Sequence, residues 1–404
     1  MLGGSHLAKA YKILLIFGTR PDSIKLAPVY HALRRAFGVK AVKGVATAQH
    51  REMLDTVLDI FDIEVDHDLD IMKPRQTLED ISSAIFQKMP EILDAEKPNL
   101  VLVHGDTTTA CITALACFYR EIPVGHVEAG LRTPDKWIPY PEEMNRRVID
   151  TVADELFAPT SKAAKALARE GIKENVYITG NTVIDALFEA RRKIRQGAKI
   201  SKIIKDLPHK HTILVTAHRR ESWGHDLEEI AKALKDIAGA FPDYIIYFPI
   251  HLNPVVRENM MPVLRGPANI VISDPVGYLD FVAAMDRSKL ILTDSGGIQE
   301  EAPSLGVPVL VMREVTERRE GLRAGCLKLV GPKRDKIFQW AKKLLTDKDL
   351  YENMSKVSNP YGDGYAARRI ANIIKVKALG RHPDKGNDFA FDEAVQSSRA
   401  PGWL

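Results

Sequence analysis

The sequence predicts an α/β protein made of two doubly wound, parallel-sheet domains that face a central cleft. Its 404 residues exceed what one hydrophobic core usually organises. Short apolar runs of strand length alternate with amphipathic stretches of helical length, which is typical of parallel sheets covered by helices. A charged stretch at residues 196–210 interrupts this alternation, and a new strand-like run follows it directly. We therefore place the domain boundary in this stretch.

Composition excludes several classes of function. The formal net charge is only +4, with 57 basic and 53 acidic residues, so we expect no broad basic face for nucleic acid. No apolar run approaches the roughly 20 residues that cross a bilayer, so we expect no membrane span. The three cysteines form no CxxC pair, and the sequence contains no n-region, h-region and cleavage site of a secretion signal. These features together predict a cytoplasmic protein.

The first domain is predicted to span residues 12–196. Each of its apolar runs is followed by a turn or loop and then by a helical pattern. The predicted strands are residues 12–17, 39–46, 100–104 and 124–127. The predicted helices cover about 24–33, begin near 51 and 107, and cover 143–152 and 183–195.

The second domain is predicted to span residues 211–364 and to repeat this architecture. Its predicted strands are residues 212–216, 244–249, 269–272, 290–293 and 307–312. A late amphipathic helix at 365–379 is a candidate to cross back to the first domain, and residues 380–404 form a peripheral tail. In such a pair of Rossmann-like domains, ligands bind at the carboxyl ends of the strands.

Two loops have the chemistry of a phosphate site. The turn from Phe17 to Pro21 places Arg20, with Lys25 one helical turn later, beside free backbone N–H groups. Solvated charges at an ordinary strand-to-helix turn explain it equally well. The turn matches neither GxGxxG nor GxxxxGK[ST], which argues against a dinucleotide fold or a P-loop.

The second loop is its counterpart in the other domain. Ser295, Gly296 and Gly297 follow a strand and open a helix, so a phosphate could approach the helix N-terminus closely. Glu301, one turn later, could hold ribose hydroxyls. A helix start capped by Asp or Ser would look the same. Because the pattern occurs in both halves, we favour a nucleotide diphosphate held across the cleft.

Acidic residues cluster after the strands of the first domain. Asp106 follows the strand at 100–104, Glu128 follows the strand at 124–127, and Glu142 and Glu143 precede a helix. Asp106 could simply cap a helix, and Glu143 could simply favour a helix dipole. Glu128 lies beside small residues and is harder to explain by packing. Acids from these three segments, if they meet at one edge of a cleft, would suit proton transfer.

Two histidines occupy equivalent places in the second domain. His218 follows its first strand and His251 its next one. A single such histidine is more often structural than catalytic, but the pair is suggestive. Neither belongs to a closely spaced ligand set, so we expect no metal. Cys111 and Cys117 are expected to be buried rather than nucleophilic.

The motifs assembled so far resemble those of the non-hydrolysing UDP-N-acetylglucosamine 2-epimerases, from about residue 12 to 379. Ten blocks in the same order carry this resemblance: FGTRPDSIKLAPV from Phe17, TAQHREML from Thr47, HGDTTTA from His104, HVEAGLRT from His126, PEEMNRR from Pro141, GNTVIDAL from Gly180, TAHRRES from Thr216, PIHLNP from Pro249, DSGGIQEEAPSLGVPVLVMR from Asp294 and NPYGDG from Asn359. Asp22 and Ser23 stand where the family usually has Glu and Ala. The resemblance implies the glycosyltransferase-B type of fold.

The resemblance also implies roles for individual residues. Asp106, Glu128 and Glu142 would be the acid/base candidates, with His218 near the diphosphate and sugar. Arg20, Lys25, Ser295, Gly296, Gly297 and Glu301 would bind the substrate and its UDP, with Phe281 near the uracil. Bacterial members bind a second sugar nucleotide as an activator, and the matching positions here are Gln49, Glu52, Arg75, Arg219 and His251.

The activity implied is reversible inversion of carbon 2 of UDP-N-acetylglucosamine, through elimination of UDP to a 2-acetamidoglucal and its re-addition. No cofactor is expected, and the family suggests a homodimer. Four alternatives stay open at this point: a hydrolysing 2-epimerase, an epimerase of a diacetamido uronic acid nucleotide, a glycosyltransferase of the same fold, and a non-catalytic sensor.

Overall fold

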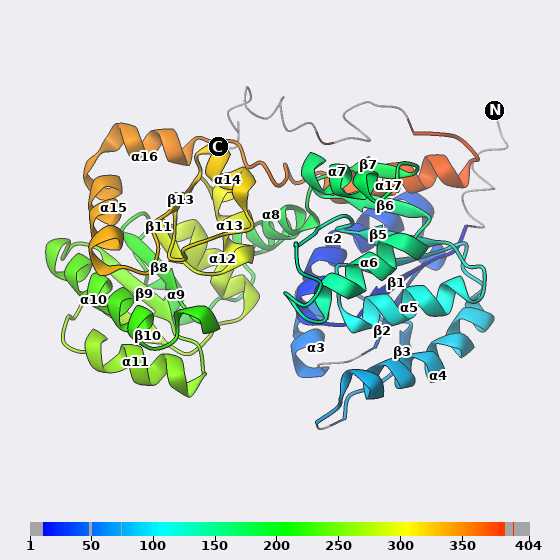
Figure 1. The fold of residues 1–404 in the computed structure, drawn as a ribbon, viewed down its shortest axis with the longest axis horizontal. Helices are drawn as coiled ribbons and strands as arrows, with labels where there is room; N and C mark the ends of the chain where they lie inside the picture. Colours follow the sequence, from blue (N-terminus) through cyan, green and yellow to red (C-terminus); the bar gives the residue numbers. More distant parts are fainter. Residues whose placement is uncertain (1–10, 48–50, 74, 384–390, 392–404) are drawn as a thin grey trace. The chain divides into compact units, whose positions relative to one another are not determined.

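The chain forms two compact units in the computed structural model, which describes residues 11–47, 51–73, 75–383 and 391 (Figure 1). The first unit contains the chain up to Glu189 and a returning segment that begins at Gly362. The second unit runs without interruption from Ala190 to Tyr361. No helix in the described part of the chain is long and apolar enough to span a membrane.

The first unit is built on a sheet that has, in the described residues, seven parallel strands in the order β3-β2-β1-β4-β5-β6-β7. The two strands at the middle of the sheet, Ile13–Phe17 and Leu100–His104, are fully buried and almost entirely apolar, because helices cover both of their faces. The strands are β1 Ile13–Phe17, β2 Val42–Ala46, β3 His67–Asp68, β4 Leu100–His104, β5 Val124–Val127, β6 Glu155–Ala158 and β7 Val176–Ile178.

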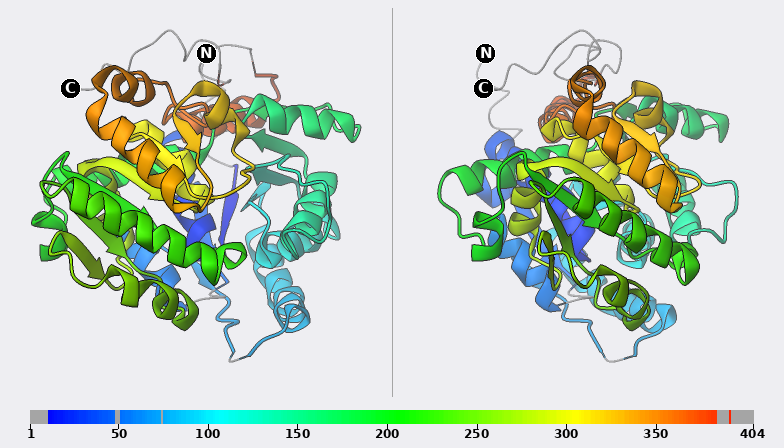
Figure 2. Two further views of the ribbon diagram at one scale, coloured as in Figure 1. Left: turned by 60° about the vertical axis from the view of Figure 1, so that its left-hand side comes forward. Right: turned by 90° about the vertical axis from the view of Figure 1, so that its left-hand side faces the viewer.

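Helices cover both faces of this sheet (Figures 1 and 2). Helices α4 (Leu78–Glu96), α5 (Thr108–Phe118) and α6 (Glu142–Val152) pack on one another and bury one side of β1, β4 and β5. The remaining helices of this unit include α2 Arg20–Phe37, α3 Arg51–Ile60, α7 Ser161–Arg169 and α17 Ala366–Ala378. Helix α8, Thr182–Arg195, runs across the boundary between the units.

The second unit has the same architecture on a parallel sheet, with six described strands in the order β10-β9-β8-β11-β12-β13. The strands are β8 Thr212–Thr216, β9 Ile245–Pro249, β10 Ile270–Ser273, β11 Ser288–Thr293, β12 Val309–Val311 and β13 Leu327–Leu329. The helices are α9 Lys202–Lys205, α10 His225–Ala240, α11 Pro254–Leu264, α12 Tyr278–Arg287, α13 Gly296–Glu301, α14 Arg319–Ala324, α15 Arg334–Thr346 and α16 Lys348–Ser355.

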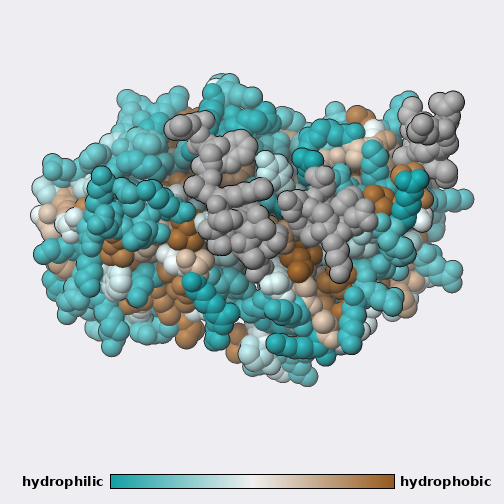
Figure 3. Space-filling view, turned by 90° about the horizontal axis from the view of Figure 1, so that it is seen from above, coloured by the Kyte–Doolittle hydropathy of each residue, from teal (hydrophilic) through white to brown (hydrophobic). Residues whose placement is uncertain are grey.

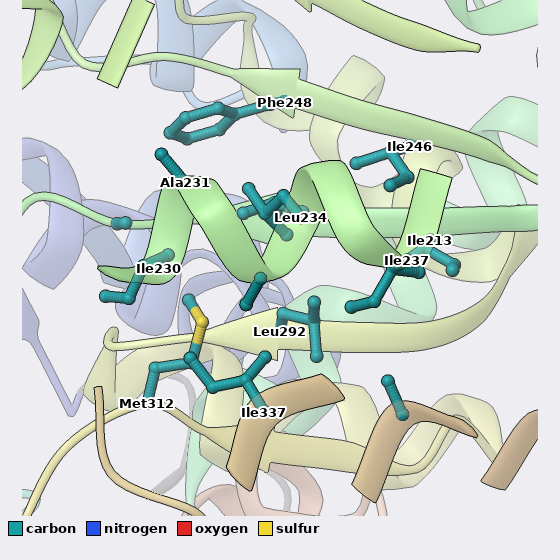
Figure 4. Packing of buried hydrophobic residues seen from close by; sticks show 14 of the residues in the cluster. Ile213, Ile230, Ala231, Leu234, Ile237, Ile246, Phe248, Leu292, Met312 and Ile337 are labelled. Atoms are coloured by element: carbon teal, nitrogen blue, oxygen red, sulfur yellow. The ribbon is translucent and has the colours of Figure 1, made fainter. Parts of the chain in front are cut away.

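The core of the second unit lies between its sheet and helices α10, α11 and α15. Figure 4 shows Ile230, Leu234 and Ile237 of α10 packed between strand residues and Ile337 of α15. All four isoleucine and leucine side chains are fully buried. On the face drawn in Figure 3, hydrophilic residues cover most of the described surface. A packed core with a hydrophilic surface is typical of α/β domains, in which the loops between the elements often carry the binding and catalytic residues.

The strand orders fix where each unit can bind a ligand. In the first sheet the order reverses between β1 and β4, and in the second it reverses between β8 and β11. At such a switch point the loops after the two strands diverge to opposite faces and leave a crevice at their carboxyl ends. The loops that leave these four strands are therefore the places to look for function.

The late helix α17 packs on α2 of the first unit. Asp185 of α8 accepts hydrogen bonds from the backbone N–H groups of Ala366 (3.2 Å) and Ala367 (2.9 Å), at the start of α17. Arg369 donates to the carbonyl of Thr179 at 3.1 Å and pairs with Asp363 at 2.6 Å. The apolar face of this helix is buried. The last helix is thus an integral part of the first unit.

The structure corrects several expected boundaries. The strand expected at 39–46 begins only at Val42, because Val39–Ala41 forms a 3-10 turn whose first residue is 60% exposed. The helix expected from about residue 24 begins at Arg20, because a proline is tolerated in the first helical turn. The short strands β3, β6, β7 and β13 were not predicted. They have two to four residues each, too few for a periodic pattern.

Candidate active site

The candidate site includes Arg20 at the start of α2, directly after β1. The carboxylate of Asp22 accepts hydrogen bonds from the backbone N–H and the hydroxyl of Thr19, both at 2.7 Å, and fixes the start of the helix. Burial raises the pKa of Asp22 to about 7 against the effect of these hydrogen bonds. Arg20 is the first residue of the helix and is half-buried. The N-terminal turn of α2 therefore presents a guanidinium at the carboxyl end of the sheet.

Lys25, also on α2, pairs with Glu128, the acid that follows β5. Its Nζ lies 2.5 Å from Oε1 of Glu128, which also accepts a hydrogen bond from Nδ2 of Asn181 at 3.2 Å. The side chains of Lys25 and Glu128 are 18% and 10% exposed. Glu128 has a φ of +72°, an unfavourable backbone region for a residue with a side chain. Strain of this kind is concentrated at functional sites.

Asp106 follows the neighbouring strand β4 and is held by α6. Its carboxylate pairs with the guanidinium of Arg146, and its carbonyl accepts a hydrogen bond from Asn145 at 2.9 Å. His104 and Val127 are register partners in β4 and β5, so Asp106 and Glu128 leave adjacent strand ends. Arg146 was not singled out in the sequence, where it is one of two consecutive arginines.

The two consecutive glutamates of α6 have different surroundings. Glu143 is fully buried and accepts hydrogen bonds from the Thr133 N–H (3.0 Å), from Arg146 (3.2 Å) and from Arg147 (2.8 Å). Glu142 is half-buried, and its Oε2 is a buried atom without a hydrogen-bond partner in the described structure. Glu143 therefore braces the loop that precedes α6, whereas Glu142 has an oxygen available for a ligand or a proton.

A fully buried histidine–aspartate pair connects the segments that carry these acids. Both ring nitrogens of His126 face acceptors: Oδ1 of Asp150 at 2.6 Å and the carbonyl of Gly105 at 2.7 Å. Asp150, on α6, also accepts from the N–H of Gly130 at 3.1 Å. Burial would raise the pKa of Asp150, but His126 and Arg132 outweigh it and hold that pKa below its ordinary value. The loops after β4 and β5 are thereby tied to α6.

The second unit provides a helix start at its own switch point. Ser295 precedes α13, and its side chain caps no backbone group of that helix. A Cβ added to Gly296 would lie 3.1–3.3 Å from the guanidinium of Arg318, so this cation lies directly over the turn. Arg318 is held there by Glu300, whose Oε1 accepts from its Nε at 2.9 Å. Nothing in the sequence distinguishes Arg318 from the arginines near it.

Glu301 ends α13 and is buried beside α12. Its Oε1 accepts a hydrogen bond from the hydroxyl of Tyr278 at 3.1 Å. Phe281, half-buried, follows Tyr278 by about one turn of α12. Tyr278 and Glu301 thus contact one another, in the same unit as Phe281 and the Ser295–Gly297 turn.

Asp294 organises the loop after β8. Its buried carboxylate accepts hydrogen bonds from the backbone N–H groups of His218 (2.6 Å) and Arg219 (2.8 Å), and it lies 3.3 Å from Nδ1 of His218. Burial lowers the pKa of His218; Asp294 opposes this, and Arg219 and His251 add to it. The rings of His218 and His251 stack with centroids 5.6 Å apart. Asp294 therefore holds the backbone at His218 and lies close to its ring.

The structure places the sequence-predicted residues in two groups. Arg20 and Lys25 lie in the first two turns of α2, Asp106 and Glu128 lie on the loops after β4 and β5, and Glu142 is the first residue of α6. The second group, from the other unit, is His218, Arg219, His251, Phe281, Ser295, Gly296, Gly297 and Glu301. Arg75 lies apart on an exposed turn with a φ of +59°. Gln49 and the side chain of Glu52 lie outside the described residues.

Within the described part of the chain, no group of three or more His, Cys, Asp or Glu could hold a metal ion.

Comparison with known proteins identifies the family. The family model described as UDP-N-acetylglucosamine 2-epimerase matches residues 32–375. The chain belongs to the UDP-N-acetylglucosamine 2-epimerase family. The UDP-N-acetylglucosamine 2-epimerase of Escherichia coli K12 is 50% identical to it over 370 residues, which cover 90% of this chain and 98% of that protein.

Solved structures agree with this assignment. The UDP-GlcNAc 2-epimerase of Neisseria meningitidis, solved bound to UDP-GlcNAc, is 44% identical and matches with a TM-score of 0.80, over 90% of this chain and 99% of that one. The glycosyltransferase SnogD of Streptomyces nogalater is only 14% identical, with a TM-score of 0.56 over 92% of this chain and 98% of that one, and shares the fold alone. The epimerase therefore has the fold of two Rossmann-like domains that also serves glycosyltransferases, and it is an isomerase.

Four residues that contact the candidate site were not singled out in the sequence: His104, Arg146, Asn181 and Arg318. His104, Arg146 and Asn181 lie inside the quoted motifs, in HGDTTTA, PEEMNRR and GNTVIDAL. Their positions in these blocks were a usable signal, but their contacts with Glu128 and Asp106 depend on residues 24 to 53 positions away. Such contacts become visible only once the strands are paired.

Proposed function

We propose that the epimerase inverts carbon 2 of UDP-N-acetylglucosamine reversibly, by eliminating UDP to a 2-acetamidoglucal and adding it back. The proposal rests chiefly on one observation. Lys25 and Glu128, a cation and an acid, form a half-buried pair at the β1/β4 switch point, next to the Asp106–Arg146 pair. Cations there can stabilise a leaving diphosphate, and acids there can move a proton.

The elimination follows from the weak acidity of the substrate. The hydrogen on carbon 2 is not adjacent to a carbonyl group, so a carboxylate of ordinary basicity cannot remove it directly. As the bond from carbon 1 to the UDP oxygen breaks, positive charge develops at carbon 1 and acidifies this hydrogen. UDP leaves with the bonding electrons, a carboxylate takes the proton, and a double bond forms between carbons 1 and 2.

The return step inverts the configuration. A proton is delivered to carbon 2 from the opposite face, and an oxygen of UDP bonds again to carbon 1. Two acid/base groups on different sides of the sugar are required, and Asp106, Glu128 and Glu142 are the candidates. Glu142 differs from the other two because one of its oxygens is buried without a partner in the described structure.

The leaving diphosphate needs donors whose interactions strengthen as its charge grows. We assign this role to Arg20, Lys25 and His218, to the Ser295–Gly297 helix start and to Arg318. Glu301 is suited to the ribose hydroxyls and Phe281 to the uracil. The complex of the Neisseria relative with UDP-GlcNAc supports the same ligand here.

The decisive experiment incubates the purified protein with UDP-N-acetylglucosamine in deuterium oxide and follows carbon 2 by NMR. We expect UDP-N-acetylmannosamine that carries one non-exchanging deuteron at carbon 2. Free N-acetylmannosamine would indicate the hydrolysing reaction instead. Unchanged substrate would favour a glycosyltransferase or a sensor and would contradict the proposal.

We also propose that a second molecule of UDP-N-acetylglucosamine activates the enzyme. Arg219 and His251 are the positions that support this, because His251 stacks on His218 and Arg219 has a buried Nε without a partner in the described structure. Initial rates should then rise more steeply than a hyperbola with substrate concentration, and Arg219→Gln should make the curve hyperbolic. Hyperbolic kinetics in the unaltered enzyme would refute activation.

A homodimer in the cytoplasm completes the proposal. The three buried free cysteines are compatible with a reducing compartment. Sedimentation of the purified chain at micromolar concentration would show a species of about twice the 45.1 kDa mass if the dimer forms. A species of 45.1 kDa would exclude it at that concentration.

A further inference from the structure

One buried histidine beside the acid cluster has no role in the mechanism above. His104, the last residue of β4, is 3% exposed, and its Nε2 is buried without a hydrogen-bond partner among the described residues. The histidine on the neighbouring strand, His126, has both ring nitrogens bonded. An unpaired polar atom in a protein interior is unfavourable and rare, so its retention calls for an explanation.

A candidate catalytic acid lies close to this nitrogen. Nε2 of His104 lies 3.7 Å from Oε2 of Glu128, slightly beyond hydrogen-bond distance. The other oxygen of Glu128 is held by Lys25 at 2.5 Å and by Asn181 at 3.2 Å. A small rotation of the Glu128 carboxylate would bring its Oε2 onto the histidine.

His104 can act here only as a neutral group. Burial lowers its pKa to about 3; Glu128 opposes this shift, and Lys25 and His126 add to it. These are the charged groups that face the ring from β5 and α2. A neutral imidazole with its proton on Nε2 donates a hydrogen bond without adding a charge that a phosphate could attract.

Substrate binding creates the need for such a donor. In the function proposed above, Lys25 serves the leaving diphosphate, and a diphosphate is a stronger competitor for an ammonium group than a single carboxylate is. Glu128 would then lose the cation that holds it. We propose that His104 is a positioning residue, whose Nε2–H takes over the hydrogen bond to Oε2 of Glu128 and keeps this carboxylate aimed and ionised when Lys25 turns to the diphosphate.

The test compares His104→Leu, which removes the donor, with His104→Gln, whose amide nitrogen can occupy the place of Nε2. Epimerisation of UDP-N-acetylglucosamine by the full chain is measured from pH 5 to 9. We expect the leucine variant to lose roughly 10- to 100-fold in kcat, as the loss of a hydrogen bond to a charged group implies. The acid limb of its kcat–pH profile should move to higher pH, because the ionised carboxylate has lost a donor. KM should change much less, and glutamine should restore most of kcat.

Thr113→Val is the matched control. Thr113 is a fully buried residue of α5 in the same unit, and its hydroxyl is also unpaired in the described structure. Its replacement should leave kcat and the pH profile unchanged. If His104→Leu does not fold, His104→Asn replaces it, since its amide is one methylene too short to reach the place of Nε2. Asparagine should then lose activity where glutamine keeps it.

Two results would overturn the inference. One is a leucine variant with unaltered kcat and pH profile, as in the Thr113→Val control. The other is a glutamine variant as impaired as leucine or asparagine, which would show that the ring matters for packing. The inference rests on the proposed function, but the two fail differently. If the function is wrong, the unaltered protein places no deuterium at carbon 2, whereas failure of this inference leaves that result intact.

Discussion

At the scale of single residues, the site is defined by how chemically similar side chains are surrounded. His104, His126 and His218 all lie in or after a strand, yet His104 has an unpaired buried nitrogen, the ring of His126 bonds two acceptors, and His218 donates its backbone N–H to Asp294. The sequence identified the region of each but not these differences, because they arise from strand pairing and from α6. The sequence also could not distinguish Glu142 from Glu143. Glu143 accepts three hydrogen bonds, whereas Glu142 has a buried oxygen without a partner in the described structure.

These two glutamates should respond differently to the same substitution. Glu143→Gln weakens interactions with Thr133, Arg146 and Arg147, so thermal unfolding should begin several degrees lower, as expected for a loss of about 1–3 kcal/mol. Glu142→Gln should leave the melting temperature within about 1 °C, because loss of an unpaired charge costs little stability, yet lower kcat roughly 100-fold or more. Calorimetry and the NMR assay measure both. Equal melting temperatures would refute the structural role of Glu143.

His104 also makes stability depend on pH. Its pKa is about 3 in the folded protein and about 6.5 when the chain unfolds, so below pH 6.5 the unfolded state takes up a proton that the folded state does not. The contribution of neutral His104 to the free energy of unfolding is therefore complete above pH 6.5. It is lost as the pH falls toward 3, and the loss reaches about 2 kcal/mol at pH 5. The His104→Gln variant has no group that titrates at this position. Its melting temperature should therefore fall less between pH 7.5 and pH 5 than that of the unaltered protein. Parallel losses would contradict the assignment.

At the scale of elements, function is concentrated where strands end. The long central strands and their helices could be predicted because buried parallel strands are continuous apolar runs. The edge strands β3 and β13 could not, since two- or three-residue strands carry no period and exist only through pairing with β2 and β12. The start of α13 was predicted as a phosphate site, yet Arg318 over it comes from a separate segment.

Substitutions of Gly296 and Gly297, the two glycines at the start of α13, should affect UDP binding differently. In Gly296→Ala the new methyl group would lie 3.1 Å from Cζ of Arg318 and must displace its guanidinium, whereas at Gly297 it would meet only Oε2 of Glu301 at 3.8 Å. We expect Gly296→Ala to weaken UDP binding roughly tenfold, as the loss of a charge-assisted contact implies. Calorimetric titration would measure it, with Gly297→Ala as the control. In an Arg318→Met background the effect of Gly296→Ala should largely vanish, and full additivity would refute the coupling.

At the scale of the whole molecule, two units and a returning helix are the main features. The change of composition at residues 196–210 predicted two domains, because charge interrupts the apolar pattern there. The structure instead passes from one unit to the other inside α8, between Glu189 and Ala190, and again between Tyr361 and Gly362. A helix that continues across a boundary leaves no mark in composition, so the sequence could not locate it.

The returning segment should be sensitive at Gly364. Its φ is +81°, and an added methyl group would lie 2.4 Å from the ring of Phe188. Gly380, with a φ of +66° and open space around it, is the matched control. Gly380→Ala should cost about 1 kcal/mol from backbone strain alone, and Gly364→Ala a further ~1–3 kcal/mol from overpacking. Urea unfolding followed by circular dichroism measures both, and equal midpoints would show that α17 adapts without loss.

The return of α17 also sets an order of events during synthesis. The ribosome completes the second unit, residues 190–361, before it makes the helix that packs on α2. The part of the molecule made first must wait, with the side of α2 that α17 covers exposed, until residues 366–378 emerge. An arrested nascent chain that ends near residue 361 should therefore expose the α2 face to proteases or chaperones while its later half is already protected.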